Sequence, residues 1–87
     1  MFTVSVRGYA VPTFKLLANA RIEIRANEHV PPHFHLIGPN SNALVDIRNL
    51  EILRGRASRS DFREAVAWAV DHMEDLLAEW SRLNERS

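Results

Sequence analysis

The sequence predicts an α+β fold in which a small antiparallel sheet of three to five strands is covered on one face by one long C-terminal helix. Three observations lead to this prediction. Short segments in the first two thirds of the chain alternate apolar with polar residues, which is the period of a half-buried strand. Residues 59–84 instead carry apolar residues at three- and four-residue spacing, without proline or glycine. The chain has 87 residues, which is enough for one hydrophobic core but not for two.

The strands are predicted from this alternation and from the turn-forming residues between the segments. Residues 27–32 are expected to form a loop, because proline donates no backbone hydrogen bond and restricts the residue before it. Residues 38–42 are turn-forming types, and Gly55 is expected to end the sheet. The predicted strands are residues 1–6, 13–17, 21–26, 33–37, 43–47 and 51–53.

The helix is predicted to begin at Ser58, with Asp61 three residues later as in a capping box; Ser60 is an alternative cap. A straight helix over residues 59–84 would be about 39 Å long, which exceeds the ~30 Å breadth of a domain of this size. Either the helix bends near Asp71 and His72, or its end overhangs the domain and packs on another chain. We favour the overhang, and with it a homodimer formed through this helix.

Period-two alternation assigns the side chains of the sheet to two faces. One face is apolar and is expected to pack on the helix; it carries Ile22, Ile24, Phe34, Leu36, Val45 and Ile47. The opposite face is expected to be open and polar, which is unusual for a sheet unless something binds there. It carries Arg21, Glu23, Arg25, His33, His35, Asp46 and Arg48. Both tryptophans, Trp68 and Trp80, are expected to pack in the core.

Composition narrows the possible functions. The chain has no cysteine, which excludes disulfides, a thiol nucleophile and a thiolate zinc site. No apolar run approaches the ~20 residues of a membrane span, and we expect a cytoplasmic protein. The formal net charge is zero, although residues 1–57 hold seven Lys/Arg against four Asp/Glu and residues 58–87 hold four against seven. This asymmetry is too small to predict nucleic-acid binding by itself.

Three of the four histidines lie within seven residues, as His29, His33 and His35. Histidine binds transition metals and transfers protons near neutral pH, so this segment is the candidate functional site. His33 and His35 are two apart on a predicted strand and should point the same way. With His29 as a third nitrogen and Asp46 or Glu28 as an oxygen, they would hold a divalent metal such as zinc, and an open position would make the centre hydrolytic. The alternative is that these histidines only form hydrogen bonds or pack on the loop.

Two further interpretations remain open. A metal-free ribonuclease needs a general base and a general acid, for which His33, His35 and Asp46 are the candidates, and an arginine such as Arg21, Arg25 or Arg48 to stabilise charge. A binding module would instead use the polar face or the sheet edge to meet a partner chain. The candidate binding residues are His29, Pro31, Pro32, His33, His35, Arg25 and Arg48.

The run Asn27-Glu28-His29, followed by Pro31-Pro32-His33-Phe34-His35, resembles the signature of a small bacterial family known only as a domain of unknown function. The resemblance continues through residues 44–47, 50–55, 67–69 and 76–80, and it covers about residues 12–84. It implies a single α+β domain over residues 12–87, preceded by an N-terminal extension of residues 1–11. It also implies a gene that is often paired with another small gene, in an arrangement like a toxin–antitoxin pair.

From the sequence we therefore expect a domain that acts mainly by interaction, in a regulatory or toxin–antitoxin-like gene pair, with the neighbouring gene product as a partner. No cofactor is required by this interpretation. The alternatives are a histidine-based hydrolase or ribonuclease, with or without a metal, and a passive metal-binding module.

Overall fold

The computed structural model describes residues 13–85, so the predicted strand over residues 1–6 and the extension 1–11 lie outside the described part of the chain. Five strands come first, and two helices follow them. The strands form one antiparallel sheet in the order β2-β3-β4-β5-β6, so each pairs with its neighbour in sequence. The elements are β2 (Thr13–Leu16), β3 (Arg21–Glu23), β4 (His33–Gly38), β5 (Ser41–Asp46), β6 (Ile52–Arg56), α1 (Arg59–Val70) and α2 (Met73–Asn84).

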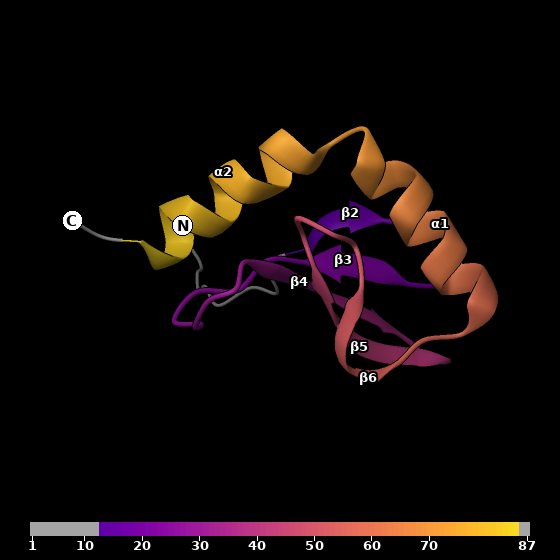
Figure 1. Cartoon of the computed structure of the whole chain (residues 1–87). Helices are drawn as coiled ribbons and strands as arrows, with labels where there is room; N and C mark the ends of the chain where they lie inside the picture. The colour runs from indigo at the N-terminus through magenta and orange to yellow at the C-terminus, as the bar shows by residue number, and fades with distance from the viewer. Residues whose placement is uncertain (1–12, 86–87) are drawn as a thin grey trace, which may run out of the picture.

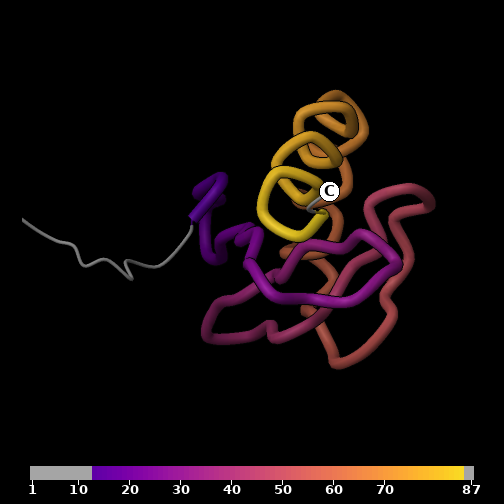
Figure 2. The backbone as a smooth tube through the Cα atoms, turned by 90° about the vertical axis from the view of Figure 1, so that its left-hand side faces the viewer, coloured from indigo at the N-terminus to yellow at the C-terminus, as the bar shows by residue number. Residues whose placement is uncertain are grey.

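Both helices lie on one side of the sheet, where they form an arch over the strands (Figure 1). Figure 2 shows the same arrangement from the side, with the helices stacked above the strands. The predicted α+β class and antiparallel sheet are confirmed. Within residues 13–85, neither helix is long and apolar enough to cross a membrane.

Several strand boundaries differ from the prediction by one residue, and three differences are larger. β3 ends at Glu23 rather than Ala26, although Ile24 remains buried. β4 and β5 extend into the predicted turn, where Gly38 pairs with Ser41. Gly55 was expected to end the sheet, but it lies inside β6. Its φ of +86° is the left-handed conformation that glycine adopts without strain, and an added Cβ would lie 2.1 Å from the carbonyl oxygen of Asn42.

The prediction of one continuous helix is wrong, because the chain breaks between α1 and α2 at Asp71 and His72. His72 leaves the helical conformation (φ −132°, ψ 22°), and its Nδ1 donates to the carbonyl oxygen of Trp68 at 2.7 Å. Its imidazole also stacks on the indole of Trp68 at 4.0 Å between ring centroids. The break changes the direction of the chain between α1 and α2, and both helices lie over the strands (Figure 1). The helix therefore bends, which is the other outcome that its length allowed, and its length no longer favours a homodimer.

The start of α1 is the predicted Ser58 cap, completed by a residue from the sheet. The backbone N–H of Asp61 donates to Ser58 Oγ at 3.1 Å. In a capping box the side chain of Asp61 would accept directly from the backbone N–H of Ser58. Here Ser41 lies between these two groups. Ser58 N–H donates to Ser41 Oγ at 3.0 Å, and Ser41 Oγ donates to Asp61 Oδ2 at 2.6 Å. The cap therefore also joins α1 to β5.

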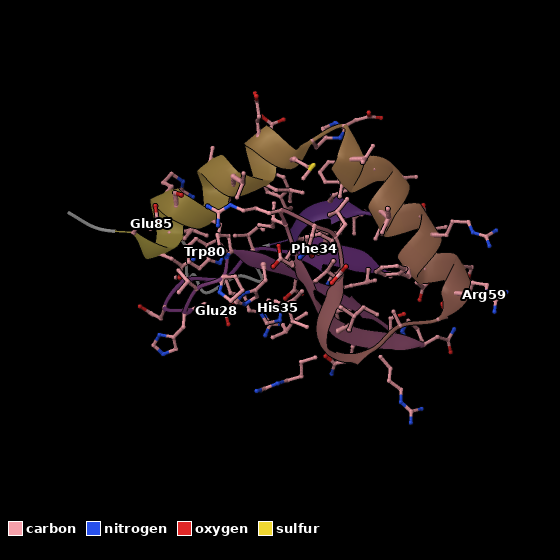
Figure 3. The ribbon with its side chains drawn as sticks, in the orientation of Figure 1. Glu28, Phe34, His35, Arg59, Trp80 and Glu85 are labelled. Atoms are coloured by element: carbon pink, nitrogen blue, oxygen red, sulfur yellow. The ribbon has the colours of Figure 1, made fainter. Side chains whose placement is uncertain are left out.

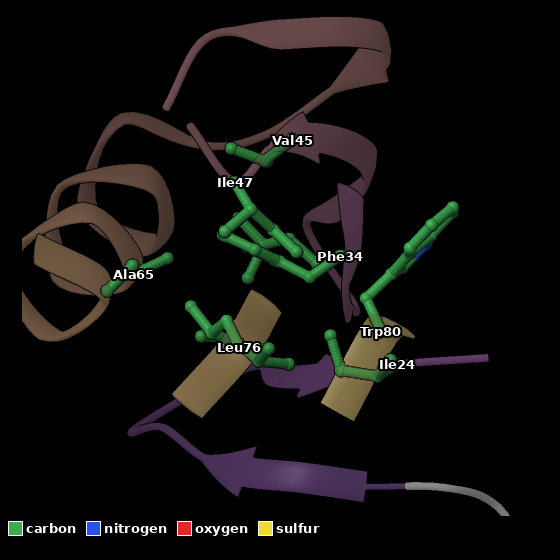
Figure 4. Packing of buried hydrophobic residues seen from close by; sticks show 10 residues of the cluster. Ile24, Phe34, Val45, Ile47, Ala65, Leu76 and Trp80 are labelled. Atoms are coloured by element: carbon green, nitrogen blue, oxygen red, sulfur yellow. The ribbon is translucent and has the colours of Figure 1, made fainter. Parts of the chain in front are cut away.

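The hydrophobic core lies between the sheet and the two helices (Figure 4). The six apolar strand residues predicted to face the helix are all at most 1% exposed, as are Ala65, Ala69, Leu76 and Trp80. Trp68 is half-buried and packs against the core cluster. Val70, which falls at the break, is instead 56% exposed. The core prediction from period-two and period-3.6 spacing is confirmed for these strand residues and for both tryptophans.

The opposite face is polar as predicted, but it is not open. Glu23, His33, His35 and Asp46 are between 1% and 8% exposed. Glu23 is covered by two arginines on its own segment, and the two histidines are covered by the loop before β4. Buried polar side chains need hydrogen-bond partners. On this face Glu23 finds them in arginines, and the two histidines find one in Glu28.

Candidate metal centre

The loop between β3 and β4 is held by the last residue of α2. Asn84 Nδ2 donates to the carbonyl oxygens of Arg25 (2.9 Å) and Trp80 (3.0 Å). Asn84 Oδ1 accepts from the backbone N–H of Glu28 at 2.6 Å. Asn27, just before it, has a φ of 63°, a left-handed conformation that asparagine tolerates better than most residues. These contacts hold Glu28 over the sheet.

His33 and His35 lie on β4 with one residue between them, so their side chains share one face of the sheet. Their side chains are 8% and 9% exposed, and their ring centroids lie 5.5 Å apart. Trp80 of α2 packs beside His33 at 6.3 Å between centroids. Figure 3 shows Glu28, His35 and Trp80 close together, under the C-terminal part of α2. Glu28 of the loop thus contacts both rings, and Trp80 of α2 also packs beside His33.

Both imidazoles are directed at the same carboxylate oxygen. Glu28 Oε1 lies 3.0 Å from His33 Nε2 and 2.7 Å from His35 Nε2. One ligand atom from each of Glu28, His33 and His35 lies within 4.8 Å of the others. Two imidazole nitrogens and one carboxylate oxygen are a donor set used by zinc, with three ligands from the protein.

The proton on His33 follows from its second hydrogen bond. His33 Nδ1 lies 2.8 Å from the carbonyl oxygen of Pro31, which can only accept, so Nδ1 carries a proton. In neutral His33 the Nε2 atom then bears a lone pair that faces the carboxylate of Glu28. Either a second proton on Nε2 or a metal ion at that position makes this contact attractive. A backbone carbonyl that holds the far nitrogen is also how proteins orient metal-binding histidines.

The structure places the predicted site residues in different surroundings. His29, predicted as a third nitrogen ligand, is exposed and lies outside the three-residue group, whose third member is Glu28. Asp46, a catalytic candidate, pairs with His33 in register across β4 and β5. Its Oδ1 accepts from the backbone N–H groups of Arg48 (2.7 Å) and Asn49 (3.2 Å), so it stabilises the turn after β5.

Of the remaining predicted residues, some line surface grooves at the histidines and others have structural roles. Pro31 lines a groove with Glu28, while Pro32 is buried. Arg25 lies beside His35 but donates Nε and Nη2 to Glu23 Oε1 at 2.9 and 2.7 Å. Arg48 is exposed and does not line either groove at the histidines.

Two grooves reach the histidines from the surface. The first has a volume of about 380 Å³ and is lined by Glu28, His33, Leu44, Leu53, Arg54 and the loop before β4. The second, of about 350 Å³, is lined by His35, Arg25, Leu44, Arg54 and their neighbours on β5 and β6. Leu44 and Arg54 line both. Four residues at the site were not predicted from the sequence, because they belong to other elements and no local sequence pattern connects them with the histidines. They are Leu44, Leu53, Arg54 and Asn84.

A second carboxylate cluster lies on the same face. Glu23 is 1% exposed, and both its oxygens accept from arginines: Oε2 from Arg21 and Oε1 from Arg25. Burial alone would raise the pKa of Glu23, but the hydrogen bonds and charges of Arg25 and Arg21 outweigh it and lower that pKa below its ordinary value of 4.5. In this cluster a buried carboxylate has both oxygens occupied by partly exposed arginines.

Comparison with known proteins gives one family. The family model described as Domain of unknown function (DUF4160) matches residues 19–81, which is more than two thirds of the chain. The chain belongs to this family. The matched residues include the loop, both histidines of β4 and Trp80. No curated protein and no solved structure matches the chain.

Proposed function

We propose that the protein binds one divalent transition-metal ion, with zinc as the best candidate, between Glu28, His33 and His35. The observation that carries the proposal is the convergence of three ligand atoms within 4.8 Å, with both histidine side chains less than 10% exposed. Both histidines are positioned by β4, and His33 is further held by the Pro31 carbonyl and by Trp80.

The donor set fits the ion. Two ligands at about 2.0–2.1 Å from a tetrahedral zinc lie roughly 3.3 Å apart. Glu28 Oε1 is 3.0 Å from one Nε2 and 2.7 Å from the other, so these separations need to grow by about 0.3 and about 0.6 Å to reach the zinc geometry. The ion would also replace the second proton that His33 otherwise needs in order to face Glu28 favourably.

Three protein ligands leave a position for water or substrate, as in catalytic rather than structural zinc sites. When bound, such an ion polarises a ligand oxygen and lowers the pKa of bound water. The grooves beside His33 and His35 give a ligand access to the site. Hydrolysis, which needs only water as a second reactant, is the reaction class that this arrangement supports.

The test is zinc titration of the chelator-treated protein, with the stoichiometry checked by elemental analysis and native mass spectrometry. We expect one ion per chain, and a loss of affinity of about 100-fold or more in His33→Ala and His35→Ala. His29→Ala is the matched control, because His29 lines the same groove but contributes no atom to the three-residue group, and this variant should bind zinc as the wild type does. No stoichiometric zinc, or zinc binding that survives both β4 substitutions, would overturn the proposal.

We also propose a second candidate, a role in protein–protein interaction, which one observation favours. β6 is an edge strand whose five residues are all exposed, and Ile52 and Leu53 on it are 40% and 46% exposed. Among residues 13–85 no strand pairs with the outer side of β6, and a sheet edge of this kind can accept a strand from another chain. The partner would be the product of a paired gene or a second copy of the chain. Light scattering of the purified protein, and of a Leu53→Lys variant, tests the second copy.

A further inference from the structure

The arrangement of β5 and β6 brings a cation to the histidine side of the sheet. Leu44 pairs with Arg54, and Val45 pairs with Ile52, so Leu53 is an extra residue at a bulge. A bulge of this kind turns two successive side chains to the same side. Leu53 and Arg54 accordingly line the same groove as Glu28 and His33.

Arg54 lies in one row with a proposed metal ligand. Leu44 pairs with His35 across β4 and β5, and with Arg54 across β5 and β6. Directly opposed residues share a face and have Cβ atoms about 5 Å apart, so His35 and Arg54 lie on the order of 10 Å apart, with Leu44 between them. A small oxyanion and the arginine side chain can fill that distance.

The charges around the site also favour an anion. Arg54 is in none of the ion pairs formed among residues 13–85, whereas Arg21, Arg25 and Arg82 are each bound to a glutamate. A bound divalent ion would exceed the single negative charge of Glu28. Apolar surface lies beside the arginine, because Leu44 and Leu53 line the groove, as does Val30, which is 71% exposed.

We infer that Arg54 forms an oxyanion subsite beside the metal centre, and that the ligand is a phosphate ester whose apolar part packs on Leu44 and Leu53. The inference rests on the proposed metal-binding function and names the ligand class of that same site. Arginine suits this role because its planar guanidinium binds two phosphate oxygens at once.

The experiment is calorimetric titration of the zinc-loaded protein, freed of excess zinc, with phenylphosphonate as the probe. We expect binding that Arg54→Gln weakens by about 10- to 100-fold, the usual effect of losing a charge-assisted hydrogen bond. Arg56→Gln is the matched control: it removes the same charge from the same strand, and Arg56 lines neither groove at the histidines. Benzoate should bind more weakly than phenylphosphonate, because it carries less charge.

Each outcome decides the inference. If zinc binds but phenylphosphonate does not, or if Arg54→Gln and Arg56→Gln behave alike, the subsite is wrong while the metal centre stands. If benzoate binds as tightly as phenylphosphonate, the phosphate assignment is wrong. If the preceding zinc titration shows no bound ion, the proposed function fails first, and the inference fails with it.

Discussion

Two carboxylates on the same face of the sheet differ in their surroundings: Glu23 is 1% exposed, whereas the side chain of Glu28 is 23% exposed. Glu23 accepts from two arginines, one at each oxygen, and Glu28 faces two histidines with a single oxygen. Arginine stays protonated at any physiological pH, so the Glu23 cluster is a closed ion pair. Histidine can give up its proton to a metal ion, and the Glu28 cluster lies on a groove. The basic partner and the access to solvent therefore both distinguish the structural carboxylate from the one that is available for chemistry.

The largest expected effect is on zinc affinity. It comes from giving the Glu28 cluster an arginine, the kind of basic partner that Glu23 has. His35→Arg would give Glu28 a permanently charged partner and remove one nitrogen ligand. We expect the zinc affinity to fall by about 100-fold or more, which is roughly 2.7 kcal/mol of binding free energy. Competition with a chelating dye measures this. Wild-type affinity in this variant would mean that His35 is not a ligand.

Removing the structural carboxylate should cost stability instead. Glu23→Gln leaves two arginines with a neutral partner and points an amide N–H₂ at one of them. We expect the free energy of unfolding to fall by about 1–3 kcal/mol, measured with urea in the presence of chelator. Glu79→Gln is the control, since Glu79 also accepts from an arginine, Arg82, but on the surface, and it should cost less than about 1 kcal/mol.

The lowered pKa of Glu23 also predicts how the free energy of unfolding depends on pH. Because the native pKa of Glu23 lies below 4.5, its contribution is fully present above that pH and is lost as the pH falls through the lowered native value. The wild type should therefore lose stability below pH 4.5 more steeply than Glu23→Gln, as judged from urea transitions at pH 6, 4.5 and 3. Parallel loss in the two proteins would show that Arg21 and Arg25 do not hold the pKa of Glu23 low.

The smallest expected effect is that of Glu28→Gln in the absence of metal. Glutamine keeps an acceptor oxygen for the histidines, and the side chain of Glu28 is already 23% exposed. The free energy of unfolding with chelator present should change by less than about 1 kcal/mol. A loss as large as that of Glu23→Gln would contradict the comparison, since it would make the Glu28 cluster a structural ion pair as well.

Much of the fold could be predicted from local patterns. The alternation around Ile22, Phe34 and Val45 predicts strands and the buried face, because a side chain's direction in a strand depends only on its position. Ser58 is the helix cap in the structure as in the prediction. The break at His72 could be predicted only as one of two outcomes, because no proline or glycine marks it and the stack on Trp68 forms in three dimensions.

Part of the candidate site could likewise be predicted from local patterns, and part could not. His33 and His35 could be paired from their spacing on one strand, whereas the loop conformation decides that Glu28, and not Asp46 or His29, joins them. That conformation is held by Asn84, which is 56 residues away in sequence from Glu28. The direction of Arg54 depends on a bulge, and period-two counting places Leu53 and Arg54 on opposite faces.

By itself, then, the sequence determined the α+β class, the two faces of the sheet, the helix start and the pair of histidines on β4. These features follow from side-chain periodicity and capping, which act over a few residues. Only the tertiary structure decided whether the helix breaks at Asp71 and His72, which carboxylate meets the histidines and which arginine reaches their side of the sheet. The last two depend on contacts between different elements, and the break lets both helices cover one sheet, so packing selects one local conformation among several that the sequence permits.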